Sequence, residues 1–264
     1  MTAIALTIAG SDSGGGAGIE ADLKTFSALG VYGAAVLTAL TAQNTKGVFA
    51  IHQVPADFIA AQIDAVLSDL AVGAVKIGML GEAAAIDAVA AGLSRHGARN
   101  IVLDPVMVAS TGADLLRADA TEALPRLIAR ADLLTPNLFE AATLLNTAMA
   151  RDEAEMRAQG QKLLALGAGA VLMKGGHGGG AESVDVLVEA DRCTRFAAPR
   201  LPTKNTHGTG CTLAAAIAAG LAKGLALEAA VGEAKAYVGA ALAAADRLAV
   251  GSGHGPLHHF YKWW

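Results

Sequence analysis

Four small residues before an alanine-rich stretch form the pattern most suggestive of chemistry. Gly208, Thr209, Gly210 and Cys211 directly precede TLAAAIAAGLAKG, which is typical of a helix. Glycines at a helix start let backbone N–H groups converge, and the positive helix end favours an anion there, such as a transferring phosphoryl group. A thiol in the first turn leans toward thiolate from a free pKa of about 8.5 and could orient or activate a hydroxyl. The alternative is a small buried residue that only packs the helix start.

Polar side chains at the ends of apolar runs are a second group of candidates. Asn137 and Glu140 lie three residues apart in TPNLFE, on one side of a starting helix, and such oxygen ligands suit Mg²⁺. Lys174 ends an apolar run, where it could reach a phosphate, and Asp104 before a proline could hold metal or pair with Lys174. Each has an ordinary alternative: helix capping for the amide and its partner, a surface position for the lysine, a turn for the aspartate.

The glycine-rich stretch GSDSGGGAGIEAD, residues 10–22, could be mistaken for a dinucleotide-binding fingerprint. It contains no GxGxxG, the next strand does not end in an acidic residue, and no GxxxxGK[ST] loop occurs in the chain. A hydride-transferring enzyme is therefore disfavoured. The stretch offers backbone amides at a helix start with Asp12 and Asp22 as acceptors, or else it is a set of turn glycines with Asp12 as an N-cap.

Short apolar runs alternate with helical patterns, and this alternation must position the candidates. Six runs are predicted to be buried parallel strands: residues 3–9, 35–40, 75–77, 100–103, 132–134 and 170–173. Apolar residues recur on one helical face within residues 19–29 and 59–70. We expect an open, mostly parallel sheet with helices on both faces and a site beyond the carboxyl ends of the strands. Residues 183–189 and 192–197 suggest a late antiparallel pair at the sheet edge.

Bulk properties predict one α/β domain spanning residues 1–264. The chain is 53% hydrophobic and 17% charged, which supplies a large core and excludes a disordered chain. Its net charge of −4 and the absence of a basic run argue against nucleic acid as a partner. Residues 210–232 are apolar, yet Lys223 and Glu228 favour a buried helix over a membrane span. Two cysteines without a CxxC pair indicate a reducing compartment, so we expect a cytoplasmic protein.

The histidines near the end of the chain do not predict a zinc site. His254, His258 and His259 lack the cysteine or carboxylate partners that a zinc pattern requires. We expect HHFYKWW to dock its aromatic rings onto the body of the protein or across a subunit interface. Cys193, inside an alternating run, is expected to be structural.

Taken in order along the chain, the motifs resemble a known family. They are AGSDSGGGAGIEADLKTFSALGVYG, LTAQNT, KIGMLG, LDPVM, TPNLFEA, VLMKGGH, TKNTHGTGCT and GPLHHF. Their order is similar to that in the hydroxymethylpyrimidine and phosphomethylpyrimidine kinases of thiamine biosynthesis, members of the ribokinase-like superfamily. The resemblance spans residues 4–264 and is far more specific than any single motif. It implies a single-domain ribokinase-like fold and a homodimer.

The resemblance also implies an activity and a binding pocket. Such enzymes use ATP and Mg²⁺ to phosphorylate the hydroxymethyl group of 4-amino-5-hydroxymethyl-2-methylpyrimidine, and then convert the monophosphate to the diphosphate at the same site. By resemblance, Gln43 hydrogen-bonds the aminopyrimidine. Four further residues match positions that line its pocket: Gly10, Asp22, Met79 and Val106.

The phosphate side of the site follows from the same resemblance. Cys211 stands where most superfamily sugar kinases carry an aspartate base, at the end of an anion hole that matches Gly208, Thr209, Gly210 and Cys211. The metal and phosphate region matches Asp104, Asn137 and Glu140. The phosphate-contacting lysines match Lys174 and Lys235.

Two other functions stay open. A pyridoxal or pyridoxine kinase of the same superfamily is the nearest alternative, because some of these carry a GTGC-type loop and accept a hydroxymethyl group on a six-membered ring. Gln43 and Met79 favour the pyrimidine. A catalytically idle ligand-sensing protein with the same fold is the second alternative. The intact site residues argue against it: Asp104, Asn137, Glu140, Lys174 and the GTGC loop, residues 208–211.

Overall fold

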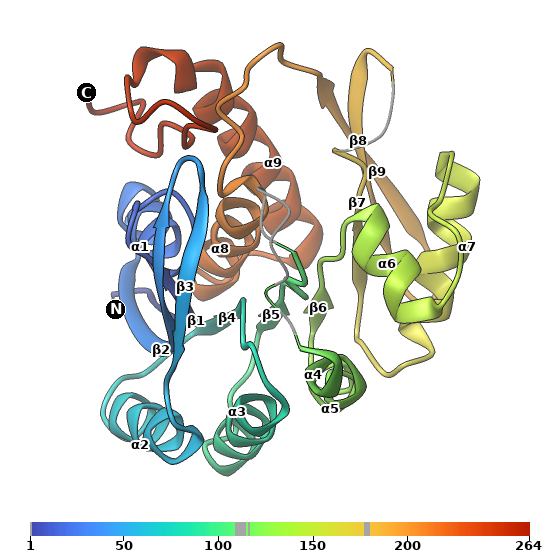
Figure 1. Ribbon diagram of the computed structural model, residues 1–264. Coiled ribbons are helices and arrows are strands. Elements are labelled where there is room, and N and C mark those ends of the chain that lie inside the picture. The colour runs from blue at the N-terminus through green and yellow to red at the C-terminus, as the bar shows by residue number, and fades with distance from the viewer. Residues whose placement is uncertain (1, 109–114, 116, 177–179) are drawn as a thin grey trace.

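One sheet runs through the chain, and helices pack around it (Figure 1). The computed structural model describes residues 2–108, 115, 117–176 and 180–264. Within these ranges the sheet has nine strands in the order β3-β2-β1-β4-β5-β6-β7-β8-β9. The strands are β1 (Ile4–Asp12), β2 (Tyr32–Asn44), β3 (Gly47–Gln53), β4 (Ala74–Ile77), β5 (Ile101–Leu103), β6 (Leu133–Leu134), β7 (Val171–Lys174), β8 (Glu182–Val188) and β9 (Cys193–Pro199).

The middle of the sheet is parallel and its edges are antiparallel. Six neighbouring strands pair in parallel, in the order β2, β1, β4, β5, β6 and β7. The edge strands are antiparallel: β3 on one side, and β8 and β9 on the other. The predicted mostly parallel sheet and the late antiparallel pair are therefore confirmed. The sequence patterns do not predict β3, because its residues are exposed on both faces and show neither a buried run nor an alternation.

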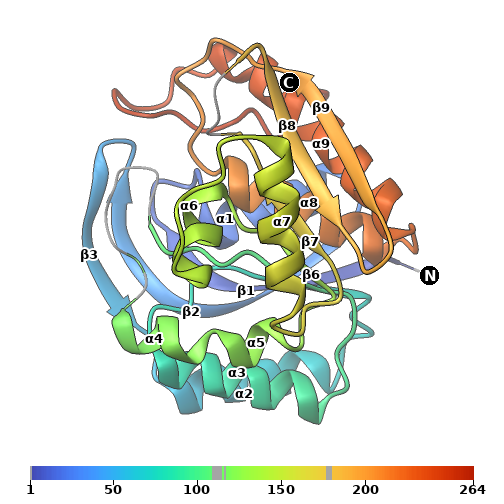
Figure 2. The same ribbon diagram turned by 90° about the vertical axis from the view of Figure 1, so that its right-hand side faces the viewer.

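Helices cover both faces of the sheet, as predicted (Figure 2). On one face lie α1 (Gly18–Ala28), α8 (Thr209–Ala222) and α9 (Leu227–Ala243). On the other lie α2 (Ala56–Leu67), α3 (Ala83–Arg95), α4 (Ala118–Ala123), α5 (Pro125–Ile128), α6 (Leu138–Leu145) and α7 (Glu153–Leu164). A short 3₁₀ turn, Ala245–Arg247, follows α9. Each face has its own hydrophobic core.

The α8 helix is buried on almost all sides. Residues 212–220 are all buried, since α8 lies between the sheet and its neighbours α1 and α9. Gly224, with a φ of 86°, stands in the break where the apolar stretch turns from α8 into α9. Burial is thus confirmed for α8, but the stretch 210–232 forms two helices, α8 and the start of α9, and not the one helix expected. Within the described residues, no helix combines the length and the hydropathy that a membrane span requires.

The C-terminal residues 254–264 pack partly onto the face that carries α8 and α9. His258 and His259 are buried, and Tyr261 packs against the same core. Trp263 and Trp264 are exposed, so docking onto the body is confirmed for Tyr261 but not for the tryptophans. Cys193 is an exposed strand residue. No group of three or more histidine, cysteine or acidic residues is placed to hold a metal ion in the part of the chain that the structure describes.

His259 should make the stability of the fold sensitive to acid. Burial lowers the pKa of His259 to about 4, and Lys24 and His258 act in the same direction. Its contribution is full above the unfolded-state pKa of about 6.5 and is lost as the pH falls through about 4. The free energy of unfolding should fall by about 3 kcal/mol over that interval.

Urea unfolding at a series of pH values between about 7 and 4 measures this loss. His259→Gln removes the titrating group and should flatten the pH dependence. An unchanged slope in that variant would place the acid sensitivity elsewhere.

Candidate active site

The predicted anion-binding residues lie at the start of α8, beyond the carboxyl ends of the parallel strands. Gly208 has a φ of 80°, and a side chain there would collide with the carbonyl oxygen of Gly16. The left-handed backbone and the close approach both require glycine. A Cβ built on Gly210 would lie 3.4 Å from Lys174 Nζ and 3.6 Å from Asp104 Oδ2. The positive end of α8 therefore faces a charged cluster at the ends of β5 and β7.

That cluster consists of Lys174 and two carboxylates. Lys174 Nζ lies 2.6 Å from Asp104 Oδ1 and 3.8 Å from Glu140 Oε2, and the lysine side chain is 11% exposed. Burial lowers the pKa of Lys174, but the two carboxylates outweigh burial and the pKa is raised. The predicted pairing of Asp104 with Lys174 is confirmed, and the surface alternative for this lysine is wrong.

Glu140 is the member of this cluster whose charge is least secure. Burial raises the pKa of Glu140 to about 7, Lys174 opposes the rise and Asp104 adds to it. Without Lys174 the two carboxylates would repel one another, so the lysine organises this cluster. A cation or a phosphate bound here would change the protonation of Glu140, because its pKa already depends on Lys174 and Asp104 nearby.

Asn137 and Glu140 also form a capping box at the start of α6. The side chain of Asn137 accepts from the Glu140 N–H at 2.8 Å, and Glu140 Oε2 accepts from the Asn137 N–H at 2.7 Å. The capping alternative is therefore realised. Glu140 both caps α6 and belongs to the charged cluster. The Lys174 N–H donates to the carbonyl of Pro136 at 2.8 Å, which brings the end of β7 beside the start of α6.

Cys211 occupies the first turn of α8 and is partly buried. Burial raises the pKa of its thiol to about 11, while Lys76 opposes the rise and Asp22 and Asp104 add to it. The expectation that the helix start makes this residue lean toward thiolate is wrong for the free protein. Burial outweighs the positive end of the helix, so the thiol is protonated at neutral pH.

Two of the residues predicted to line the pyrimidine pocket, Gly10 and Met79, lie against each other. Strand β1 is irregular between Ala9 and Ser11, and β2 between Ala42 and Gln43, which re-aims both strand ends at the rim of the sheet. A Cβ built on Gly10 would lie 3.2 Å from Met79 Sδ, so these two positions touch.

Gln43 reaches the start of α8 through a histidine. Gln43 Nε2 lies 3.3 Å from His207 Nε2, and His207 immediately precedes Gly208. His207 Nε2 also lies 2.8 Å from Asp12 Oδ2, and Asp12 accepts the backbone N–H groups of residues 14, 16 and 17. The glycine-rich loop after β1 and the loop before α8 are therefore joined through one carboxylate.

Two other residues predicted to line the pocket take different positions. Val106 is partly buried two residues beyond Asp104, and its N–H donates to the Asp104 carbonyl at 2.8 Å. Asp22 is fully buried in α1, where Oδ2 lies 2.7 Å from Lys76 Nζ. Its Oδ1 has no hydrogen-bond partner among the described residues. A role for Asp22 in substrate binding stays a prediction.

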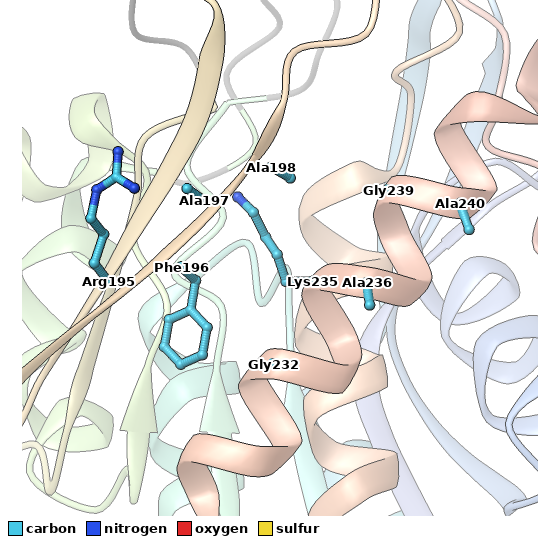
Figure 3. Close-up of a pocket in the computed structure, with 9 residues that line it drawn as sticks. All are labelled: Arg195, Phe196, Ala197, Ala198, Gly232, Lys235, Ala236, Gly239 and Ala240. Carbon is cyan, nitrogen blue, oxygen red and sulfur yellow. The ribbon is translucent and has the colours of Figure 1, made fainter.

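Lys235 lies on α9 at the border of an open cavity. The cavity has a volume of about 400 Å³ and lies between α9 and β9 (Figure 3). Its lining comprises Arg195, Phe196, Ala197, Ala198, Gly232, Lys235, Ala236, Gly239 and Ala240. Lys235 Nζ lies 2.6 Å from Asp185 Oδ2, and Asp185 Oδ1 accepts the N–H of Gly175, next to Lys174. One carboxylate thus links this cavity to the charged cluster.

Sequence patterns miss three polar residues that organise the site: His207, Asp185 and Lys76. His207 stands inside NTHGTGC and Lys76 inside KIGML, two stretches that already carry candidates. Asp185 interrupts the apolar run SVDVLVE, and a buried acid in such a run signals a partner. The partners themselves are remote in sequence, so periodicity does not reveal them.

Comparisons with known proteins agree with this arrangement. The family described as phosphomethylpyrimidine kinase matches residues 12–258. A hydroxymethylpyrimidine/phosphomethylpyrimidine kinase from Rhizobium meliloti is 60% identical over 100% of this chain and 99% of its own.

Solved structures carry the same fold. An ADP complex of Bacillus subtilis pyridoxal kinase has a TM-score of 0.90 and 35% identity, covering 98% of each chain. Phosphomethylpyrimidine kinase from Clostridium difficile has a TM-score of 0.80 and 43% identity, covering 89% of this chain and 97% of its own. Together with the ribokinase-like sheet, these matches show that the chain belongs to the phosphomethylpyrimidine kinase family.

Proposed function

We propose that this phosphotransferase phosphorylates the hydroxymethyl group of 4-amino-5-hydroxymethyl-2-methylpyrimidine with ATP, and then phosphorylates the monophosphate to the diphosphate, in thiamine biosynthesis. One observation carries the proposal. The start of α8 lies between the Lys174 cluster on one side and Gln43, which contacts His207, on the other. A nucleotide phosphate and an acceptor hydroxyl would therefore meet at the same helix terminus.

In this mechanism the acceptor hydroxyl attacks the γ-phosphorus in line with the leaving ADP. A new P–O bond forms while the bond between the γ-phosphorus and the β,γ-bridging oxygen breaks. The N–H groups of Gly208 and Gly210 stabilise the negative charge that builds on the phosphoryl oxygens, whereas the Thr209 N–H donates to the Thr206 carbonyl. In its thiolate form Cys211 accepts the hydroxyl proton and becomes the thiol; as a thiol it only positions the hydroxyl while the proton leaves to water.

The nucleotide is expected to lie across the charged cluster and the α9 cavity. We propose that Lys174, Lys235, Thr209 and Asn137 contact its phosphates. Lys174 and Lys235 are joined through Asp185 and the backbone of Gly175, which places two cations along one path. The ADP complex of the Bacillus subtilis pyridoxal kinase supports a nucleotide site in this fold.

Asp104 and Glu140 suit Mg²⁺, which prefers oxygen ligands and needs few protein groups beside the phosphates. Both are buried next to the anion site, and Lys174 provides the charge balance when no other cation is there. We propose that these two carboxylates hold Mg²⁺, directly or through its waters. The ion would neutralise phosphate charge, and the lysine and the amides perform the remaining stabilisation.

Gln43→Ala should raise the KM for the pyrimidine by about 10- to 100-fold, because the ring edge would lose its amide partner. The value of kcat should change little, since the amide contacts substrate and transition state equally. Steady-state kinetics with saturating ATP measures both constants. An unchanged KM would place the pyrimidine elsewhere.

Pyridoxal phosphorylation is the second candidate function, and the structural similarity to the Bacillus subtilis pyridoxal kinase favours testing it. The test compares hydroxymethylpyrimidine, its monophosphate and pyridoxal in parallel, with products identified by mass. Diphosphate formation from the monophosphate supports the thiamine-pathway function. Turnover of pyridoxal alone overturns it, and pyrimidine binding without ATP turnover would indicate a ligand sensor.

We further propose that residues 1–264 form one domain and assemble as a homodimer. The β2–β3 hairpin offers an apolar surface for a second copy, with Leu40, Phe49 and Ile51 exposed by 45%, 69% and 37%. Sedimentation should report a dimer that Phe49→Glu weakens, and a monomer at micromolar concentration would overturn this. Location in the cytoplasm and the absence of a nucleic-acid partner stay predictions from composition.

A further inference from the structure

Lys76 is a lysine with no exposure to solvent, and the proposed mechanism gives it no part in phosphoryl transfer. Its side chain lies in β4 with Nζ 2.7 Å from Asp22 Oδ2, and both side chains are 0% exposed. Thr7 Oγ1 donates to the same carboxylate oxygen at 2.6 Å. Such a pair is poor evidence for a stabilising role, because apolar residues of similar volume are often as stable in its place.

Strand register determines on which face of the sheet the Lys76 side chain lies. Thr7 of β1 and Lys76 of β4 are paired neighbours, two residues beyond Ala5 and Ala74, which belong to the core that α1, α8 and α9 cover. Since side chains two apart share a face, Thr7 and Lys76 point toward those helices. Lys76 also lies near the carboxyl end of its strand, at the rim that carries the site.

The α1 helix connects Lys76 to the first turn of α8. The chain just before α1 packs against the start of α8, since a Cβ built on Gly208 would lie 3.3 Å from the Cα of Ala17. Asp22, four residues after Gly18 on α1, holds Lys76. The start of α8 and the buried ammonium therefore both contact the N-terminal part of α1.

We propose that Lys76 is a positioning residue for phosphoryl transfer: its ammonium provides positive charge behind the first turn of α8 and favours negative charge at Cys211, while Asp22 holds it in place. The proposal deepens the proposed function and rests on it for kinetics alone. The reactivity of the Cys211 thiol can be measured without any substrate.

The charges around Cys211 determine in which direction each neighbour shifts the pKa of its thiol. Four groups act on the thiol: Lys76 from β4, Asp22 from α1, Asp104 after β5 and Lys174 at the end of β7. Lys76 lowers the pKa of Cys211 more than any other of its neighbours, and Asp22 and Asp104 raise it. Removing the lysine and removing the aspartate should therefore shift the thiol in opposite directions.

The experiment measures the rate of Cys211 alkylation by iodoacetamide between about pH 7 and 10, in a Cys193→Ser background that leaves one thiol. Lys76→Met should slow alkylation about tenfold at a fixed pH below the pKa. Asp22→Asn should accelerate it. The double variant Asp22→Asn/Lys76→Met, which buries no unpaired charge, should react more slowly than the parent and faster than Lys76→Met.

Lys162→Met, which removes an exposed lysine from α7, is the matched control and should leave the rate unchanged. The double variant carries the test if Lys76→Met does not fold. Changes of the same sign in both single variants, or a folded double variant that reacts like the parent, would overturn the proposal. In the kinetic arm kcat of Lys76→Met, which leaves the predicted pocket residue Asp22 in place, should fall about tenfold with little change in pyrimidine KM. If the parent shows no kinase activity while the alkylation rates behave as expected, the proposed function fails and the charge relation stands.

Discussion

Replacing Lys174 with methionine is expected to lower kcat by about two to three orders of magnitude, since it removes a positioned cation from the site of charge development. The lysine lies 2.6 Å from Asp104 Oδ1, and the built Cβ of Gly210 lies 3.4 Å from its Nζ, so it stands between the carboxylates and the anion site. Transition-state charge that grows on the transferring group would lose its nearest fixed partner. Steady-state turnover with ATP and the pyrimidine measures the effect.

The same substitution should also destabilise the protein. Without Lys174, the carboxylates of Asp104 and Glu140 would be buried side by side without their cation, and breaking a buried pair costs about 3–5 kcal/mol. Lys174→Arg keeps the charge and separates the two effects: it should retain much of the stability and only part of the activity. A folded Lys174→Met variant with kcat within about threefold of the parent would remove this lysine from the chemistry.

Replacing Cys211 with alanine is expected to lower kcat by about two to four orders of magnitude if the thiol acts as the base. The KM for the pyrimidine should change by less than about threefold, because the residue contacts the reacting hydroxyl and not the ring edge. A fully active variant would remove Cys211 from the mechanism.

The pH dependence distinguishes a base from a positioning group. With the pKa of Cys211 raised to about 11, the thiolate fraction increases tenfold per pH unit below that value, so kcat should increase with pH across the alkaline range. Cys211→Ala should have a flat profile there, and Cys211→Ser should as well. A loss of kcat without any change of profile would indicate that the thiol only positions the hydroxyl.

Much of the fold could be predicted because it depends on local sequence. Strands of the parallel core are short apolar runs, and the start of α6 has a capping pair three residues apart, so neighbouring residues carry the information. β3 escaped prediction because an edge strand exposed on both faces needs no apolar pattern. Gly208 was recognisable for the same local reason: its left-handed backbone favours one residue type.

The electrostatics of the site could not be predicted this way. Sequence suggested that a helix start would favour the Cys211 thiolate, and burial reverses the direction. Asp12 and His207 are 195 residues apart and meet at 2.8 Å, and Lys76 and Asp22 meet across β4 and α1. No periodicity encodes such pairs.

By itself, then, the sequence determined which residue types stand at the strand ends and at the start of α8, since backbone geometry and hydrophobic period act over a few residues. Tertiary structure alone decided which of those residues touch, which are buried and which carry charge. The reason is physical: a pKa depends on desolvation and on charges within a few ångströms, and both are set by the packing of segments that are distant along the chain.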